Sequence, residues 1–60
     1  MKRHEIWDEK SRVTVYHADT PREALDKMAR SRGHRSWQTL CAFYDRDEAF
    51  AVRDGCRIIL

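Results

Sequence analysis

Two runs of alternating apolar and polar residues lie near the start of the chain, on either side of the polar segment DEKS. Strand-forming residues in period-two alternation around a polar turn are typical of a hairpin. The pattern predicts a hairpin over residues 3–17, with Trp7 opposite Arg12 and Ile6 opposite Val13. On this register the aliphatic pair faces inward, and Trp7 and Arg12 form a cation–π pair on the outer face.

A clearly punctuated helical pattern follows at residues 21–32. Thr20 is a favourable N-cap, Pro21 suits the first helical position, and Glu23 completes a T-x-x-E capping box. The apolar positions recur at helical spacing and are Ala24, Leu25, Met28 and Ala29. Gly33 is expected to end the helix, because glycine readily adopts the left-handed conformation of a C-terminal cap.

The next apolar segment, SWQTLCAFY, fits a helix better than a strand. Its apolar residues follow the i, i+3, i+4, i+7 spacing and are Trp37, Leu40, Cys41 and Tyr44. Strict alternation would instead put Gln38 on the same face as Leu40. The prediction is a short helix over residues 37–44 with Ser36 as its N-cap, and a strand is the alternative.

The last apolar segment is interrupted by the dipeptide at 54–55, Asp-Gly, which is a strong signal for a two-residue hairpin turn. It predicts a hairpin over residues 49–60 with Ala51 opposite Ile58. This register gives two apolar faces, with Phe50, Val52 and Ile59 on one and Ala51, Ile58 and Leu60 on the other. Helices that cover one face of such a sheet leave apolar surface on the other.

Together these elements predict a small single α+β domain in the order β-β-α-α-β-β. The expected architecture is an antiparallel sheet with two short helices on one face. A chain of 60 residues forms one domain at most and buries only a small core.

The C-terminal residues Ile58, Ile59 and Leu60, with Arg57 beside them, are the expected protein-interaction site. An apolar strand at the edge of a sheet promotes association unless it is paired or covered. Neither Pro nor Lys protects this segment. The expected partner is another protein, or a second copy of the chain in a homodimer.

A basic segment after the first helix is a candidate nucleic-acid site. It contains Arg30, Arg32, His34 and Arg35, and phosphate contacts by such residues add affinity through counterion release. The alternative is that these cations complement the negative C-terminal end of the helix. The net charge of only +2 is weak for a nucleic-acid-binding domain, so RNA or DNA binding is the second hypothesis.

Residues that commonly carry metal or catalytic chemistry are scattered along the chain. The cysteines and histidines include no C-x-x-C or H-x-x-x-H pair, so neither a metal nor a cofactor is expected. Residue types used by acid–base ribonucleases occur without a spacing that unites them: His4, His17, Arg35 and Tyr44. Because so small a fold also offers little pocket volume, neither an enzyme nor a small-molecule substrate is expected.

The chain contains no apolar run of about 18 residues and no basic-then-apolar leader. Cys41 and Cys56 are unclustered, which favours reduced thiols over a disulfide framework. These observations predict a cytoplasmic location and no membrane partner.

Residues 19–25, with the sequence DTPREAL, resemble the T-P-E-E-A-L step that enters the first helix of small antitoxins of the HicB type after a strand hairpin. The match covers this segment alone, and the Gly-rich strand region and DNA-binding tail of that family are absent. The resemblance implies an antitoxin. A small ribonuclease-type toxin, or its antitoxin, is therefore kept as a minor alternative function. The leading hypothesis is a non-catalytic protein-binding adaptor or inhibitor, of the kind carried by phages and plasmids.

Overall fold

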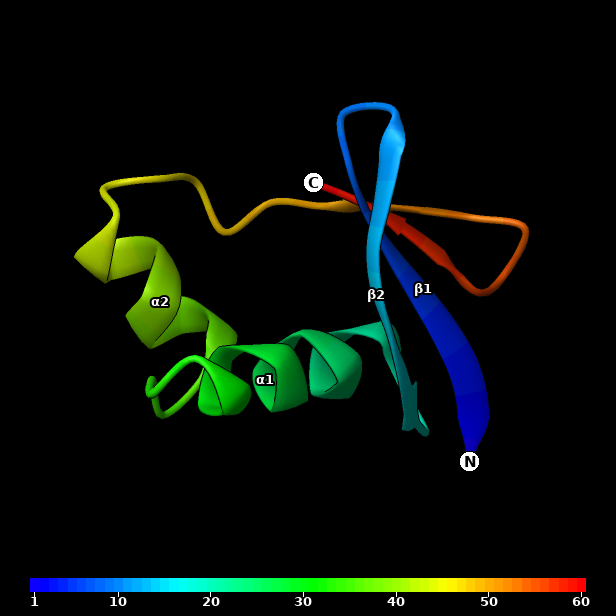
Figure 1. Ribbon diagram of the computed structural model, residues 1–60, viewed down its shortest axis with the longest axis horizontal. Helices are drawn as coiled ribbons and strands as arrows, with labels where there is room; N and C mark the ends of the chain where they lie inside the picture. Colours follow the sequence, from blue (N-terminus) through cyan, green and yellow to red (C-terminus); the bar gives the residue numbers. More distant parts are fainter.

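The computed structural model describes residues 1–60 and contains four strands and two helices. In chain order these are β1 (Lys2–Asp8), β2 (Ser11–Ala18), α1 (Pro21–Ser31), α2 (Trp37–Phe43), β3 (Ala51–Arg53) and β4 (Arg57–Ile59). Figure 1 shows both helices on one side of a strongly twisted set of strands. The predicted α+β class and the order β-β-α-α-β-β are confirmed.

The four strands form one sheet in the order β2-β1-β4-β3. The pairs β1–β2 and β3–β4 are antiparallel, whereas the central pair β1–β4 is parallel. The sheet is therefore mixed rather than antiparallel throughout. A parallel pair needs a long crossover, and the connection through both helices supplies it.

This order places β4 in the interior of the sheet, so the expectation that residues 58–60 form an exposed edge is wrong. Ile58 is fully buried. The Leu60 amide donates to the Trp7 carbonyl at 3.0 Å, so β1 occupies the side of β4 that was expected to be free. A homodimer that pairs strand edges cannot form through β4, because the edges of the sheet are β2 and β3.

The first hairpin keeps the predicted pairing of Trp7 with Arg12, but the register changes at the next position. A bulge between Ile6 and Trp7 leaves Val13 as an extra residue in β2, so Ile6 pairs with Thr14 instead. Val13 is 41% exposed rather than facing the core. Local alternation predicted the hairpin but gave no sign of the bulge.

The second hairpin contains the predicted turn at 54–55, and both turn residues have positive φ (56° and 74°), as a type I′ turn requires. The register differs by one residue, because Ala51 pairs with Ile59 rather than with Ile58. Cys56 is the additional residue, and its carbonyl accepts a hydrogen bond from β1 at 2.8 Å. The shift changes which residues share a face: Ile58 lies with Val52 on the face that meets the helices, and Ile59 lies with Ala51 on the other.

Helix α1 begins at Pro21, as predicted, and ends at Ser31, one residue before the predicted end, with Arg32 as its C-cap. The Thr20 hydroxyl accepts a hydrogen bond from the Glu23 amide at 3.2 Å. The Glu23 carboxylate in turn accepts a hydrogen bond from the Asp19 amide at 3.2 Å, one residue earlier than in the standard capping box. Gly33, with φ of 88°, follows the end of the helix as the left-handed cap.

Helix α2 is also confirmed, so the strand alternative for this segment is excluded. The Ser36 hydroxyl caps it by accepting a hydrogen bond from the Thr39 amide at 3.2 Å. The buried stripe consists of Trp37, Leu40 and Cys41. Tyr44, predicted to complete the stripe, is the C-cap and is 59% exposed.

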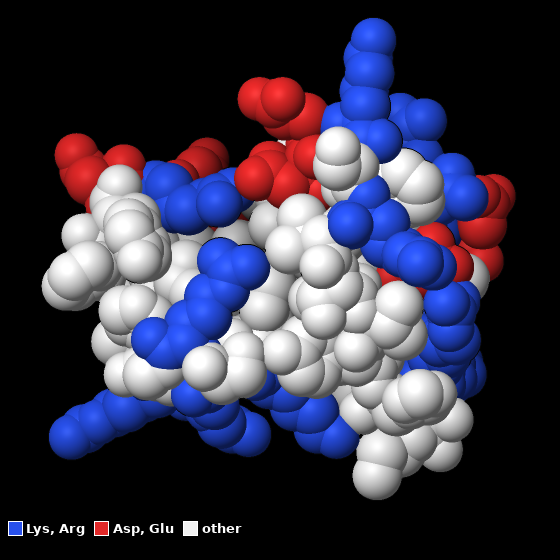
Figure 2. All heavy atoms as spheres, in the orientation of Figure 1, with Lys and Arg blue, Asp and Glu red and all other residues white.

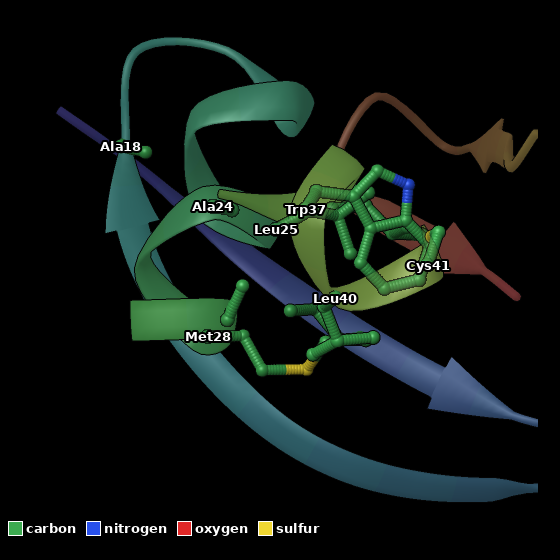
Figure 3. Close-up of a cluster of buried hydrophobic side chains, with 10 residues drawn as sticks. Ala18, Ala24, Leu25, Met28, Trp37, Leu40 and Cys41 are labelled. Carbon is green, nitrogen blue, oxygen red and sulfur yellow. The ribbon is translucent and has the colours of Figure 1, made fainter. Parts of the chain in front are cut away.

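The core lies between the two helices and one face of the sheet (Figure 3). The helices contribute Ala24, Leu25, Met28, Ala29, Trp37, Leu40 and Cys41. The strands contribute Ile6, Ala18 and Ile58. Since all three strand residues belong to the face that meets the helices, the other face of the sheet takes no part in the core.

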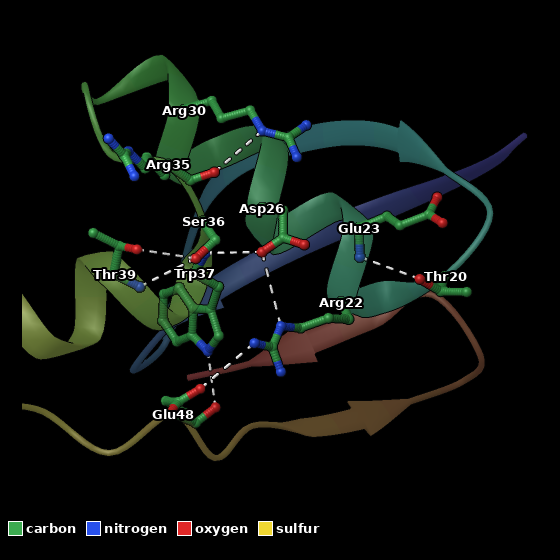
Figure 4. Close-up of polar contacts among 10 residues, drawn as sticks. All are labelled: Thr20, Arg22, Glu23, Asp26, Arg30, Arg35, Ser36, Trp37, Thr39 and Glu48. Carbon is green, nitrogen blue, oxygen red and sulfur yellow. Dashed lines mark hydrogen bonds and ion pairs between the residues drawn. The ribbon is translucent and has the colours of Figure 1, made fainter.

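Polar contacts fix α2 and the segment that follows it against α1 (Figure 4). The Asp26 carboxylate accepts a hydrogen bond from the Trp37 amide at 2.8 Å and pairs with Arg22 at 3.8 Å. The Trp37 indole donates to the Glu48 carbonyl at 2.8 Å. Arg22 also reaches the Glu48 carboxylate at 3.5 Å, so these four residues join three parts of the chain.

Candidate functional site

The face of the sheet that the helices leave uncovered, here called the open face, is the first candidate site. Strand pairing decides which residues it presents, because side chains alternate between faces and paired residues share a face. The open face has three rows, which are His17 and Arg3; Val15, Glu5, Arg57 and Arg53; and Arg12, Trp7, Ile59 and Ala51. Each row continues across neighbouring strands, so residues far apart in sequence form one surface.

Trp7 lies on the interior strand β1 of the open face and is held by two neighbouring side chains. The Arg57 guanidinium carbon is 4.8 Å from the ring centroid. The indole Nε1 donates a hydrogen bond to Glu5 Oε1 at 3.0 Å. The predicted cation–π partner, Arg12, lies opposite Trp7 in the sheet, but the contact belongs to Arg57. The sequence could not show this, because β4 reaches Trp7 only through the parallel pairing.

Glu5 is the one acidic side chain of the open face. Arg3 Nη1 donates to Glu5 Oε2 at 2.6 Å. Hydrogen bonds from Arg3 and then Trp7 lower the pKa of Glu5 below its ordinary value, and the nearby charge of Arg12 acts in the same direction. Glu5 is therefore ionised at neutral pH and orders its neighbours.

The open face carries four arginines against this single carboxylate. Arg12, Arg53 and Arg57 form no ion pair with any acidic group of the chain. Figure 2 shows that Lys and Arg project both from the strand half of the molecule, at the upper right, and from the helix half, at the lower left. Positive charge is thus not confined to the segment at residues 30–35.

The second candidate site is a groove of about 450 Å³ between the C-terminal ends of the two helices. The α2 groove, as we call it, is lined by Arg32, Leu40, Tyr44 and Arg46. Leu40 is only 3% exposed and belongs to the core cluster. The Arg46 guanidinium carbon lies 5.1 Å from the centroid of the buried Trp37 ring. Neither arginine of the groove forms an ion pair.

Two residues in the left-handed conformation shape the ends of the helices beside this groove. Gly33 follows α1, and the amide after it donates back to the Ala29 carbonyl at 3.0 Å. Asp45 follows α2 with φ of 52°, and the Arg46 amide donates to the Cys41 carbonyl at 2.9 Å. Both are Schellman-type endings, and aspartate tolerates this conformation better than most non-glycine residues. The second ending turns the chain back, so that the Arg46 guanidinium lies against the Trp37 ring of α2.

Three aromatic rings lie together at the edge of the α2 groove. The ring centroids of Phe43 and Tyr44 are 5.0 Å apart, and His34 lies 5.1 Å from Phe43 and 5.9 Å from Tyr44. Phe43 is 71% exposed and Tyr44 59% exposed. Phe43 and Tyr44 are the two aromatic residues among the exposed large hydrophobic side chains, and they lie next to each other.

The basic residues that the sequence singled out do not act as one patch. Arg32 lines the α2 groove, and His34 packs against its aromatic rings. Arg30 turns the other way, where its Nε donates to the Arg35 carbonyl at 3.3 Å (Figure 4). Arg30 also lines a shallow depression on α1 together with two acidic residues. The segment is therefore divided between two surfaces.

The predicted protein-interaction residues are divided as well. Arg57 and Ile59 belong to the open face. Ile58 is part of the core, and Leu60 packs against the core. Arg57 and Ile59 therefore lie on an uncovered surface, and that surface is a face of the sheet rather than an edge.

The residues considered for acid–base chemistry are dispersed. His4 is buried, with Nε2 3.1 Å from the Ala18 carbonyl oxygen and Nδ1 without a partner. His17 is on the opposite face of the sheet, and Tyr44 is at the end of α2. Both cysteines are free, and burial raises the pKa of the Cys41 thiol. No group of three or more His, Cys, Asp or Glu is placed to hold a metal ion, and neither helix is long and apolar enough to cross a membrane.

Sequence reasoning missed several residues of both candidate sites. Alternation along β1 already placed Trp7 with Glu5 on one face, and the same parity extends to Arg3. Arg53 could not be assigned, because the register of the second hairpin was shifted by one residue. Arg46 lies in a polar segment after α2, and no local sequence signal indicates that this segment folds back over Trp37.

Comparisons with known proteins give no relative. No protein-family model, no curated protein and no solved structure matches the chain.

Proposed function

We propose that this protein is a non-catalytic module that binds another macromolecule, and that nucleic acid is the partner the open face favours. The observation that carries the proposal is the uncovered sheet face with four arginines and one carboxylate. The carboxylate is already engaged by Arg3 and Trp7. An anionic polymer is the partner that such a surface would attract most strongly.

The state of Trp7 supports contact with the phosphate backbone rather than with bases. An exposed aromatic ring on a basic surface commonly serves as a stacking platform for bases. Here Arg57 already lies over the ring, and Glu5 holds the indole nitrogen. The free groups of the face are guanidinium groups, which bind phosphate with their planar donor array. Binding would therefore depend little on sequence.

A non-catalytic role is favoured by the separation of the acid–base residue types. His4 is in the core, and His17 is on the other side of the sheet. General acid–base catalysis needs such groups within hydrogen-bonding reach of one substrate. The proposal places the protein in the cytoplasm, where the free thiols of Cys41 and Cys56 would stay reduced.

The salt dependence of binding tests this proposal. We expect the affinity for a random-sequence duplex to fall steeply with salt, with a log–log slope of about 0.9 for each phosphate contacted. Replacing Arg12 and Arg53 with Gln should reduce that slope by the equivalent of about two phosphate contacts, because both side chains lie on the open face without ion pairs.

The matched control replaces Arg30 and Arg35 with Gln, which changes the net charge by the same amount away from the open face. Fluorescence anisotropy at several salt concentrations measures all three proteins. The proposal requires the control to retain the wild-type slope. Equal losses in both variants, or no binding by the wild type, would contradict it.

A protein partner is the second candidate, and it is favoured by the edge strand β2. This strand runs from Ser11 to Ala18 and has a neighbour on one side only. An extended segment of a partner can add to such an edge through backbone hydrogen bonds. An adaptor or inhibitor role would then use β2, rather than the C-terminal strand proposed from the sequence. Binding to a protein without a response to the Arg12 and Arg53 substitutions would favour this alternative.

A further inference from the structure

We propose that the α2 groove binds a nucleotide, with the base against Tyr44 and Phe43 and the phosphate between Arg32 and Arg46. This site is separate from the open face and does not depend on the function proposed for it. The groove combines two arginines without ion pairs, exposed aromatic rings and a volume suited to a single nucleotide.

The charge of the groove requires an anion. Arg32 and Arg46 both line it, and neither pairs with a carboxylate of the chain. Part of their charge complements the helix ends beside which they lie. No acidic side chain lines the groove, so an anionic group that enters meets two guanidinium groups and no carboxylate. Guanidinium groups bind phosphate oxygens in a bidentate manner.

The aromatic residues specify the rest of the ligand. Tyr44 lines the groove and has Phe43 against it at an interplanar angle of 80°. Both rings are mostly exposed, in contrast to Trp7, which is covered by Arg57. Stacking on a free ring is the usual way in which a protein holds an unpaired base. A ligand that is both planar and anionic satisfies the two halves of the groove together.

The size of the groove decides between a nucleotide and a peptide. Its volume of about 450 Å³ lies within the usual range of small-ligand sites. Four residues line it, whereas a stable protein interface involves about 20 to 30 residues a side. One base with its sugar and phosphate fits this scale better than an extended acidic segment.

The backbone beside the groove is held by hydrogen bonds within the chain. The endings of α1 and α2 are closed by backbone hydrogen bonds at Gly33 and Asp45. Arg46 is further held by its contact with the Trp37 ring. Little ordering of the chain is needed on binding, which favours affinity for a small ligand.

Adenosine monophosphate and adenosine are the probes that test this proposal, with binding followed by nuclear magnetic resonance of the labelled protein. We expect the monophosphate to shift the amide signals around Tyr44 and Arg46. Tyr44→Ala should weaken binding of both probes by at least about fivefold, because it removes a stacking ring. Tyr44→Phe should stay within about twofold of the wild type, because it keeps the ring.

The arginine variants separate the phosphate contact from stacking. Arg32→Gln and Arg46→Gln should each weaken binding of the monophosphate at least about fivefold and leave adenosine unchanged, because only the former carries the anion. Arg35→Gln, outside the groove, should change neither. Amide signals of the apo variants establish that each is folded. The proposal is overturned if the monophosphate fails to shift the groove signals at millimolar concentration, or if the arginine variants weaken both probes equally.

A nucleotide could reach the groove free in solution or as an unpaired unit of a strand, and the chemistry of recognition is the same. A trinucleotide distinguishes the two sources. Tighter binding of the trinucleotide than of the monophosphate, with the same response to Tyr44→Ala, identifies a strand as the ligand. Equal or weaker binding of the trinucleotide identifies the free nucleotide.

Discussion

At the scale of single residues, Glu5 links two neighbouring side chains of the open face. It joins Arg3 and Trp7 through its two carboxylate oxygens, while Arg57 lies on the other side of Trp7. A lowered pKa means that the ionised form is favoured in the folded state over the unfolded state. The contribution of Glu5 to stability is therefore present above its ordinary pKa of 4.5 and is lost as the pH falls through the lower, folded-state pKa.

The substitution Glu5→Gln tests this acid dependence. At neutral pH we expect the variant to be less stable than the wild type, because it loses a charge-assisted hydrogen bond from Arg3. Below pH 4.5 the difference should shrink, because the wild-type carboxylate becomes protonated. Urea unfolding between about pH 3 and pH 7 measures both proteins. A difference that stays constant over this range would show that Glu5 acts through packing rather than charge.

Thr20 is a second residue with a definable contribution, since its hydroxyl satisfies the Glu23 amide at the start of α1. Thr20→Ala should lower the free energy of unfolding by about 1 kcal/mol. Thr20→Ser keeps the hydroxyl and is the matched control. Thermal unfolding of a domain this small should resolve the difference, because such a loss shifts Tm by about 4–8 °C. An unchanged Tm in the alanine variant would mean that water satisfies the amide equally well.

At the scale of elements, local signals predicted the helices and missed the strand registers. The caps at Thr20 and Ser36 and the left-handed residue at Gly33 act within a few residues, so they can be read from the sequence. The registers depend on partners far along the chain. Val13 is the extra residue of a bulge in β2. Cys56 is an extra residue in the turn of the second hairpin, and its carbonyl accepts a hydrogen bond from β1. Neither event has a local sequence signal.

The register of β4 can be tested by comparing two neighbouring isoleucines. Ile58 is fully buried in the core, whereas Ile59 faces the open side of the sheet. Ile58→Ala should lower the free energy of unfolding by about 2–5 kcal/mol, or prevent folding altogether. Ile59→Ala should lower it by about 1 kcal/mol or less, as is usual away from the core. Urea unfolding measures both variants, and a larger loss for Ile59→Ala than for Ile58→Ala would contradict the burial of Ile58 in the core.

At the scale of the whole molecule, the two layers give the chain two different outer surfaces. The helices cover one face of the sheet and present the α2 groove where they end. The open face lies on the far side of the sheet. The sequence predicted this layering, since it placed both helices on one face. It could not predict the composition of either site, because each draws residues from elements that meet only after folding, as Arg32 and Arg46 do.

The parallel pairing of β1 with β4 has a consequence for how the chain acquires its structure during synthesis. Of the six elements, β1 leaves the ribosome first and β4 last, yet Glu5 pairs with Arg57 and Ile6 with Ile58. Contacts between such distant positions slow folding, because the intervening chain must be ordered before they form. Until β4 pairs with β1, the β1–β2 hairpin has an unpaired edge and an apolar face without its cover, and both features favour aggregation.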